Sequence, residues 1–169
     1  MRILIIFTFL LTSAFAKETT DIKNLVINKE LKKYDNLTFL DVKNKQINLK
    51  DYNGNLLILN FWATWCAPCK EEMPSLDLLQ KNVNFDNLKI FPINVGQEKA
   101  DKAIDFFKDL EVKNLDLYFD PSINLTKKFG LRGIPTTIFI NKDGLEFARI
   151  VGSIDFENEE FINWLKNFN

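Results

Sequence analysis

A continuous apolar run, LLILNFW at residues 56–62, ends four residues before Cys66, the first of the two cysteines in this chain. The turn-forming stretch DYNGN precedes the run, and an apolar run bounded in this way is typical of a strand buried on both faces. Residues 66–83 predict a helix, with Met73 and Val83 among the apolar residues near one face. The sequence therefore predicts a buried strand that leads into a helix, with the cysteines at the junction.

Strand and helix patterns alternate along the rest of the chain. Residues 37–49 alternate apolar and polar side chains on either side of Lys43-Asn44-Lys45, which predicts an N-terminal β-hairpin. The remaining patterns predict strands at 88–95 and 115–120, helices at 97–110 and 121–130, a hairpin of 136–140 with 145–152, and a final helix that includes Phe161 and Phe168. We therefore expect an α/β fold with a mixed central sheet flanked by helices.

The composition limits which kinds of chemistry this chain can perform. Its 169 residues, 46% of them hydrophobic, suit one globular domain, and a formal net charge of −1 gives no basic surface for nucleic acid. A zinc site needs about four ligands, which two cysteines without any histidine do not supply. We therefore expect no metal, no cofactor and no nucleic-acid partner.

The N-terminus has the pattern of a secretory signal. Residues 1–16, MRILIIFTFLLTSAFA, combine one arginine, a short apolar run and an Ala-Phe-Ala ending, which predicts cleavage after Ala16. A retained membrane anchor is the alternative. We interpret residues 17–36 as a flexible lead-in with one helical turn near 29–34, and residues 37–169 as the folded domain. Export to the periplasm or beyond would place the cysteines where disulfides persist.

The spacing of the two cysteines favours a redox couple over a structural staple. A C-x-x-C disulfide closes a very short loop, so it removes little entropy from the unfolded chain. Cys66 falls at a predicted helix N-terminus, where unpaired N–H groups and the helix dipole favour a thiolate over a thiol. Cys69 lies one turn further in, where it would be shielded. We therefore expect Cys66 to attack a partner's disulfide and Cys69 to resolve the mixed disulfide, with an inert disulfide as the alternative.

Three segments carry a resemblance to a known superfamily. NFWATWCAPCKEEMPSL resembles the active-site segment of the thioredoxin superfamily, and GIPTTIFINKDG resembles its cis-proline segment. INVGQEKADKAIDFF and the predicted N-terminal hairpin resemble the exported TlpA/ResA-type branch, which includes the cytochrome c maturation thioredoxins. The similarity extends over residues 37–167. It implies a thioredoxin-like fold with an additional N-terminal β-hairpin.

The resemblance also implies roles for individual residues. Cys66 and Cys69 would form the redox-active disulfide. Ile134-Pro135 would be a cis peptide bond that faces them, and Ile134 would offer its backbone N–H and C=O to a substrate as an added strand. Trp65 would be an exposed apolar contact for the substrate. The alternatives are a trans proline at a strand edge and a tryptophan that belongs to the core.

Position 60 departs from the cytoplasmic thioredoxins, which have a buried aspartate there that assists proton transfer at the resolving cysteine. Asn60 cannot accept a proton. Glu72 lies three residues after Cys69, on the same side of the predicted helix. The resemblance implies that Glu72 substitutes for the aspartate, with a pKa raised by partial burial. The alternative is a solvated first-turn carboxylate, which is how we interpret Glu71.

These features together predict an exported thiol–disulfide oxidoreductase that reduces the disulfides of partner proteins. No histidine stands next to Cys69, where strongly oxidising relatives tend to have one, so we expect a low reduction potential. The resemblance implies apocytochrome c or a copper-binding protein as the client and a membrane thiol relay as the electron donor. We expect a monomer, with membrane contact only if the leader is retained.

Three other functions remain open at this point. A thiol peroxidase is one, although Thr64 lies two residues before Cys66 and such enzymes usually carry a threonine three residues before the reactive cysteine. A non-catalytic binding or chaperone module is the second. A disulfide oxidase or isomerase is the third, and it differs from a reductant in reduction potential alone.

Overall fold

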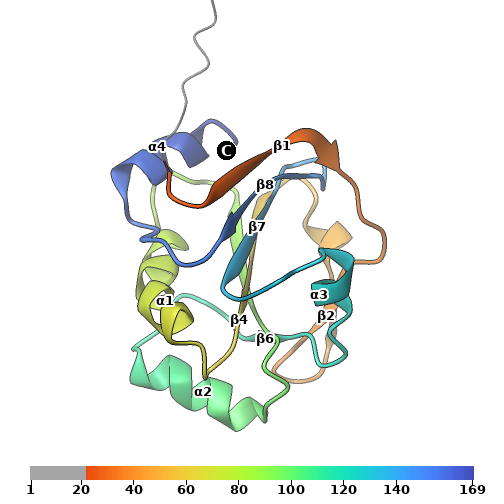
Figure 1. Cartoon of the computed structure of the whole chain (residues 1–169), viewed down its shortest axis with the longest axis vertical. Coiled ribbons are helices and arrows are strands. Elements are labelled where there is room, and N and C mark those ends of the chain that lie inside the picture. The colour runs from red at the N-terminus through yellow and green to blue at the C-terminus, as the bar shows by residue number, and fades with distance from the viewer. Residues whose placement is uncertain (1–21) are drawn as a thin grey trace, which may run out of the picture.

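A computed structural model of the chain describes residues 22–169 (Figure 1). The predicted leader at residues 1–16 and residues 17–21 of the predicted lead-in lie outside the described residues. Between residues 22 and 169, no helix combines the length and the apolar character that crossing a membrane requires.

Eight strands of the described chain form one mixed sheet. They are β1 (Leu25–Lys32), β2 (Thr38–Asp41), β3 (Gln46–Asn48), β4 (Leu56–Trp62), β5 (Leu88–Asn94), β6 (Tyr118–Phe119), β7 (Thr136–Ile140) and β8 (Glu146–Val151). Their order across the sheet is β1-β8-β7-β4-β5-β6-β2-β3. The pairs β4–β5 and β5–β6 are parallel and the others are antiparallel, so β2 and β3 form a hairpin that extends the sheet beyond β6.

Helices cover both faces of this sheet, as predicted. Within residues 22–169 they are α1 (Ala67–Leu79), α2 (Ala100–Asp109), α3 (Asn124–Lys128) and α4 (Glu159–Lys166), with a short 3-10 helix at Leu49–Tyr52. α1, α2 and α4 lie on one face and α3 lies on the other (Figure 1). The arrangement is that of a thioredoxin-like α/β fold, which confirms the predicted fold class.

β4 lies in the middle of the sheet, and all of its residues are buried. Its even-numbered apolar residues pack toward α1, α2 and α4, and its odd-numbered residues pack toward α3 and the β2–β3 hairpin. Burial on both faces explains the uninterrupted apolar run in the sequence and confirms the predicted strand. Asn60 belongs to the even-numbered series, so its side chain points to the face that α1 covers.

Residues 25–32 correct the prediction of a flexible lead-in with a helical turn. They form β1, which pairs antiparallel with β8 at the edge of the sheet. The sequence pattern is ambiguous because an edge strand keeps polar side chains on both faces. Asn28, for example, donates hydrogen bonds to the backbone and the carboxylate of Glu146, both at 3.2 Å. The sheet therefore begins at Leu25, within the predicted lead-in, rather than in the domain predicted from residue 37.

The helix predicted over residues 66–83 ends earlier than expected. α1 stops at Leu79, and Val83 is 93% exposed in the turn that follows. Asn82 shapes this turn, because its side-chain oxygen accepts the backbone N–H of Asn84 at 3.0 Å. Such local bonds compete with helical ones, so the prediction is wrong for the last four residues.

Candidate active site

The two cysteines form a disulfide at the N-terminal end of α1. Cys66 is the N-cap residue, and its Sγ accepts a hydrogen bond from the backbone N–H of Cys69 at 3.3 Å. Cys66 is 5% exposed, whereas Cys69 is 0% exposed. Cys66 therefore lies at the positive end of the helix dipole and nearer the solvent, with Cys69 behind it.

A tight turn between β4 and α1 places Cys66 at this position. The backbone N–H of Cys66 donates to the carbonyl of Ala63 at 3.2 Å, which closes the turn. The backbone N–H of Lys70 then donates to the carbonyl of Cys66, also at 3.2 Å, so the helix starts at once. Pro68 occupies the first turn, where its missing N–H leaves no hydrogen bond unmade.

The Ile134–Pro135 peptide bond is cis, as predicted. It directly precedes β7, in which Thr136 pairs with Phe61 near the end of β4. The proline and the cysteine loop therefore lie at the same end of the sheet. No backbone hydrogen bond joins Ile134 to the rest of residues 22–169, so its N–H and C=O are unpaired within the described chain.

Trp62, at the end of β4, and Trp65, within the β4–α1 turn, have opposite environments. Trp65, next to Cys66, is 69% exposed and does not belong to the core. Trp62 is fully buried and lies against the rings of Phe106 and Phe107, with centroid distances of 4.7 and 5.4 Å. The indole ring of Trp65 therefore contributes to the surface beside the disulfide and does not pack in the core.

Glu72 is buried rather than solvated, with 2% of its surface exposed. Asn60 Nδ2 donates hydrogen bonds to Glu72 Oε1 at 2.7 Å and to Thr137 Oγ1 at 3.0 Å. Glu72 Oε2 has no hydrogen-bond partner among the described residues. Burial raises the pKa of Glu72 to about 8, against the opposing effect of the hydrogen bond from Asn60. A carboxyl group with this pKa can exchange a proton near neutral pH.

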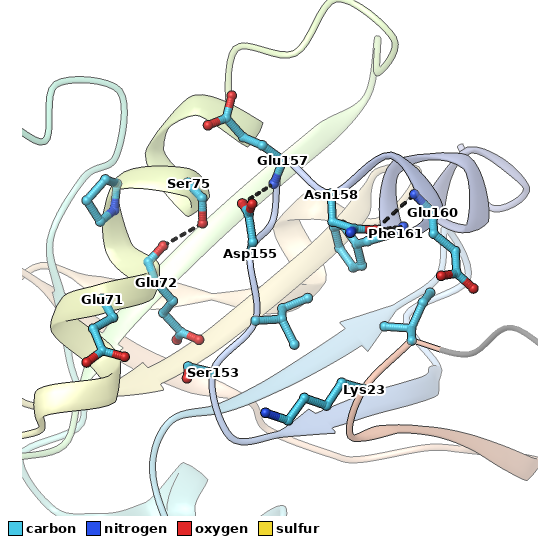
Figure 2. A pocket seen from close by; sticks show the side chains of 13 residues that line it. Lys23, Glu71, Glu72, Ser75, Ser153, Asp155, Glu157, Asn158, Glu160 and Phe161 are labelled. Carbon is cyan, nitrogen blue, oxygen red and sulfur yellow. Dashed lines mark hydrogen bonds between the residues drawn. The ribbon is translucent and has the colours of Figure 1, made fainter.

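A pocket of about 650 Å³ lies beside this carboxyl group, between α1, the loop after β8 and the start of α4 (Figure 2). Glu72 and Ser75 line it from α1, and Ser153 and Ile154 line it from the loop. Figure 2 shows the carboxyl group of Glu72 directed toward Ser153. The pocket gives the buried acid a route to solvent. Glu71, by contrast, is exposed, as we interpreted it.

A second carboxylate, Glu98, lies against the cysteine loop, and nothing in the sequence predicts it. Glu98 Oε1 accepts hydrogen bonds from the Thr64 backbone N–H and from Asn94 Nδ2, both at 2.9 Å. The Thr64 hydroxyl donates to the other oxygen of the same carboxylate. Thr64 and Glu98 are 34 residues apart in the chain, so no local pattern connects them.

A third carboxylate, Glu146, is 0% exposed and belongs to the β1–β8 edge of the sheet. Arg149 donates to it through Nε at 2.8 Å and through a terminal nitrogen at 2.9 Å, and the Tyr34 hydroxyl donates at 2.7 Å. The charge is paired and hydrogen-bonded, as a buried charge must be. This cluster is therefore structural, and sequence analysis also missed it.

The reactive groups of the site are two sulfurs and one carboxyl group. No group of three or more Cys, Asp or Glu side chains within residues 22–169 is placed to hold a metal ion. A dithiol at a helix N-terminus can exchange with a disulfide, and a buried acid can accept a proton from the shielded thiol. This is the architecture of a thioredoxin-like thiol–disulfide oxidoreductase.

Known proteins with similar sequences belong to the same class. The model of the AhpC/TSA family matches residues 25–145. The thiol-disulfide oxidoreductase ResA of Bacillus cereus is 33% identical over 153 residues, which cover 88% of this chain and 81% of that protein. ResA of Bacillus thuringiensis subsp. konkukian is 33% identical over 136 residues, covering 78% and 75%. The chain belongs to the AhpC/TSA family, and these two relatives are named thiol-disulfide oxidoreductases.

Solved structures share the fold at lower sequence identity. A secreted thiol-disulfide isomerase from Corynebacterium glutamicum superimposes with a TM-score of 0.69 at 24% identity, over 85% of this chain and 92% of that one. StoA from Bacillus subtilis gives a TM-score of 0.63 at 22% identity, over 78% and 94%. At these identities the likeness establishes the fold alone.

Proposed function

We propose that this protein is an exported reductant, which opens disulfides in partner proteins by oxidising its own cysteine pair. The observation that carries the proposal is the Cys66–Cys69 pair at the N-terminal end of α1. Only Ala67 and Pro68 separate the cysteines. A histidine there would stabilise the reduced thiolate and raise the potential, and its absence supports reduction as the direction.

The reaction begins with the reduced pair. The Cys66 thiolate attacks one sulfur of the client's disulfide, that bond breaks, and the other client sulfur leaves as a thiolate that takes a proton from solvent. Cys69 then attacks Cys66 Sγ, and the mixed disulfide breaks. The second client thiolate leaves, and the Cys66–Cys69 disulfide forms. Two electrons pass to the client, so a thiol donor must return two electrons before the next cycle.

Glu72 would accept the proton that Cys69 loses when it attacks. The carboxyl group is buried on the α1 side of β4, three residues after Cys69. Its raised pKa, to about 8, brings its proton affinity close to that of a thiol. The proton would then leave Glu72 for solvent through the adjoining pocket, while a client still covers the disulfide.

A client would dock on the surface around the disulfide. Trp65 offers an exposed aromatic ring, and Ile134 offers an unpaired backbone N–H and C=O to an extended client segment. Val151, at the same end of the sheet as Thr136, is 49% exposed and adds apolar surface. An exposed ring, a free backbone edge and an apolar side chain around the disulfide fit a short extended peptide that carries a cysteine.

Export and the identity of the partners rest on the sequence. The N-terminal segment at residues 1–16 supports export. The resemblance to the TlpA/ResA-type branch supports the cysteines of apocytochrome c or of a copper-binding protein as the client, and a membrane thiol relay as the electron donor.

Peroxide reduction is less well supported as an alternative. The Thr64 hydroxyl donates to Glu98, so it is not free to assist a reactive thiolate. Consumption of peroxide by the reduced protein would separate the two functions. A binding or chaperone module without catalysis would keep its activity when both cysteines are replaced.

Trapping of the client tests the proposal directly. The Cys69→Ser variant should leave Cys66 joined to its client as a mixed disulfide, because no thiol remains to resolve it. Mass spectrometry of the purified adducts would identify the client. Cys66→Ser, which removes the attacking sulfur, is the matched control. Recovery of no Cys66-linked adduct from Cys69→Ser, or of as much mixed disulfide from Cys66→Ser through its remaining Cys69, would contradict the proposal.

A further inference from the structure

The loop between β5 and α2 lies unusually close to the loop that carries the cysteines. The backbone N–H of Val95 donates to the carbonyl of Trp62 at 2.9 Å, so the two loops are joined where β4 ends. A Cβ atom placed on Gly96 would lie 3.0 Å from Ala63 Cβ and 2.7 Å from Glu98 Oε1. Real Cβ atoms essentially never approach another atom to 2.7 Å and rarely to 3.0 Å, so glycine at position 96 lets the two loops lie this close without displacing Ala63 or Glu98.

Glu98 connects the two loops through Thr64. Its carboxylate accepts the backbone N–H of Thr64 and the Thr64 hydroxyl, one on each oxygen. Asn94 holds the same carboxylate through its Nδ2 at 2.9 Å, while Asn94 Oδ1 accepts the N–H of Gly96 at 2.9 Å. Hydrogen bonds to an ionised acceptor are the strong ones, so this cluster fixes the backbone at Thr64.

Glu98 is ionised at neutral pH. Partial burial alone would raise its pKa, but the hydrogen bonds from Thr64 and Asn94 and the charge of Lys102 on α2 outweigh burial and lower it. All three donors therefore face a carboxylate that can accept them.

The position of Thr64 matters because the functional residues follow it directly. Trp65 is the next residue, and Cys66, the N-cap of α1, is the one after it. A shift of the backbone at Thr64 would rotate the indole ring and move Cys66 Sγ relative to the first N–H groups of the helix. Those groups favour the thiolate only when they point at the sulfur.

We propose that Glu98 is a positioning residue for the cysteine pair: by holding Thr64, it fixes Cys66 at the helix N-terminus and Trp65 at the surface. This inference rests on the proposed function, because it assigns Glu98 a part in making Cys66 reactive. Glu98 acts through Thr64 and takes no part in the chemistry itself.

The negative charge of Glu98 and its hydrogen bonds to Thr64 have opposite effects on the pH at which Cys66 reacts, which allows a clear test. Removal of a nearby negative charge would favour the thiolate and lower the pH at which Cys66 reacts. Loss of position would raise that pH. Glu98→Gln removes the charge but can still accept the Thr64 N–H and donate to the Thr64 hydroxyl. Glu98→Ala removes both the charge and the hydrogen bonds that hold Thr64 in place.

The measurement is the pH midpoint of Cys66 alkylation in the reduced protein. We expect the midpoint of Glu98→Ala to exceed that of Glu98→Gln by about 0.5 pH unit, the size of one helix-dipole contribution. Thr64→Val, which removes only the hydroxyl bond, should raise the midpoint by less and serves if Glu98→Ala does not fold. Equal midpoints for Glu98→Ala and Glu98→Gln, or for Thr64→Val and wild type, would overturn the inference.

Asp77 provides a matched control in α1, the helix that Cys66 caps. It anchors another loop, because Asp77 Oδ1 accepts the backbone N–H groups of Lys113, Asn114 and Leu115 at 2.7 to 3.1 Å. Asp77→Ala should lower the melting temperature and leave the Cys66 midpoint unchanged. A wild-type midpoint at the value of free cysteine would contradict the proposed function itself, whereas a low wild-type midpoint with unaltered variants would contradict only the role of Glu98.

Discussion

Asn60 Nδ2 lies 2.7 Å from Glu72 Oε1, so an amide from the central strand holds a carboxyl group from the helix that carries the cysteines. Both side chains are buried, with exposed fractions of 0% and 2%. The amide can donate but cannot share a proton, and Glu72 therefore remains the only titrating partner of this pair. The proton chemistry behind the disulfide depends on the environment of one carboxyl group.

Glu72→Gln should change the pH dependence of stability. The pKa of Glu72 rises from 4.5 to about 8 in the folded chain. The stability that the neutral carboxyl group contributes is fully present below pH 4.5 and is lost as the pH rises through about 8. Glutamine does not titrate, so the free energy of unfolding of the variant should rise relative to wild type by roughly a few kcal/mol as the pH goes from 4.5 to about 8. Urea denaturation at several pH values measures this difference, and a constant difference would contradict the burial of an ionisable group here.

Asn60→Asp should make the stability fall more steeply at alkaline pH. The new carboxyl group would lie against Glu72. Two carboxyl groups at this distance hold one proton between them at intermediate pH and repel each other once both are ionised. Denaturation at pH 5 and pH 9 would show the loss. Thr137→Val is the control, since it removes the other hydrogen-bond partner of Asn60 without adding charge. Equal pH dependence in both variants would contradict contact between Asn60 and Glu72.

Trp65→Ala should weaken client binding without weakening the fold. The side chain is 69% exposed, so its removal should change the free energy of unfolding by less than about 0.5 kcal/mol. The KM for a disulfide-containing peptide should rise several-fold while kcat changes little. Leu78→Ala is the control, because Leu78 is an apolar residue of α1 that is 50% exposed near its far end. A KM that rises equally in both variants would exclude a specific contact at Trp65.

Arg149→Ala should be far more destabilising than a surface substitution. It would leave the Glu146 carboxylate, 0% exposed, without its two arginine hydrogen bonds. Breaking a buried ion pair by removing one partner costs about 3–5 kcal/mol. Tyr34→Phe removes one hydrogen bond to the same carboxylate and should cost about 1–3 kcal/mol. If denaturation gave the same loss for both variants, the ion pair would not contribute as the structure indicates.

The parts of this structure that the sequence predicts are those that depend on neighbouring residues. The buried strand at residues 56–62, the helix after Cys66 and the cysteine pair between them all follow from local patterns. The cis bond before Pro135 and the burial of Glu72 agree with the resemblance to thioredoxins.

The parts that the sequence does not predict depend on contacts between distant residues. Glutamate is a residue type that is usual at protein surfaces, and the role of Glu98 appears only when Thr64 lies against it. Glu146 is a charged residue in a strand, and only Arg149 and Tyr34 make its burial possible. Residues 25–32 become a strand because β8 offers an edge for pairing, which the sequence LVINKELK, half apolar and without regular alternation, does not reveal.

The most direct test of the account is the pH dependence of alkylation at each cysteine of the reduced wild-type protein, resolved by mass spectrometry. The account predicts that Cys66 is modified first, with a midpoint below the free-cysteine value of about 8.5. Cys69, which is 0% exposed, should react later and only at higher pH. Modification of Cys69 first, or a Cys66 midpoint at the value of free cysteine, would contradict the account.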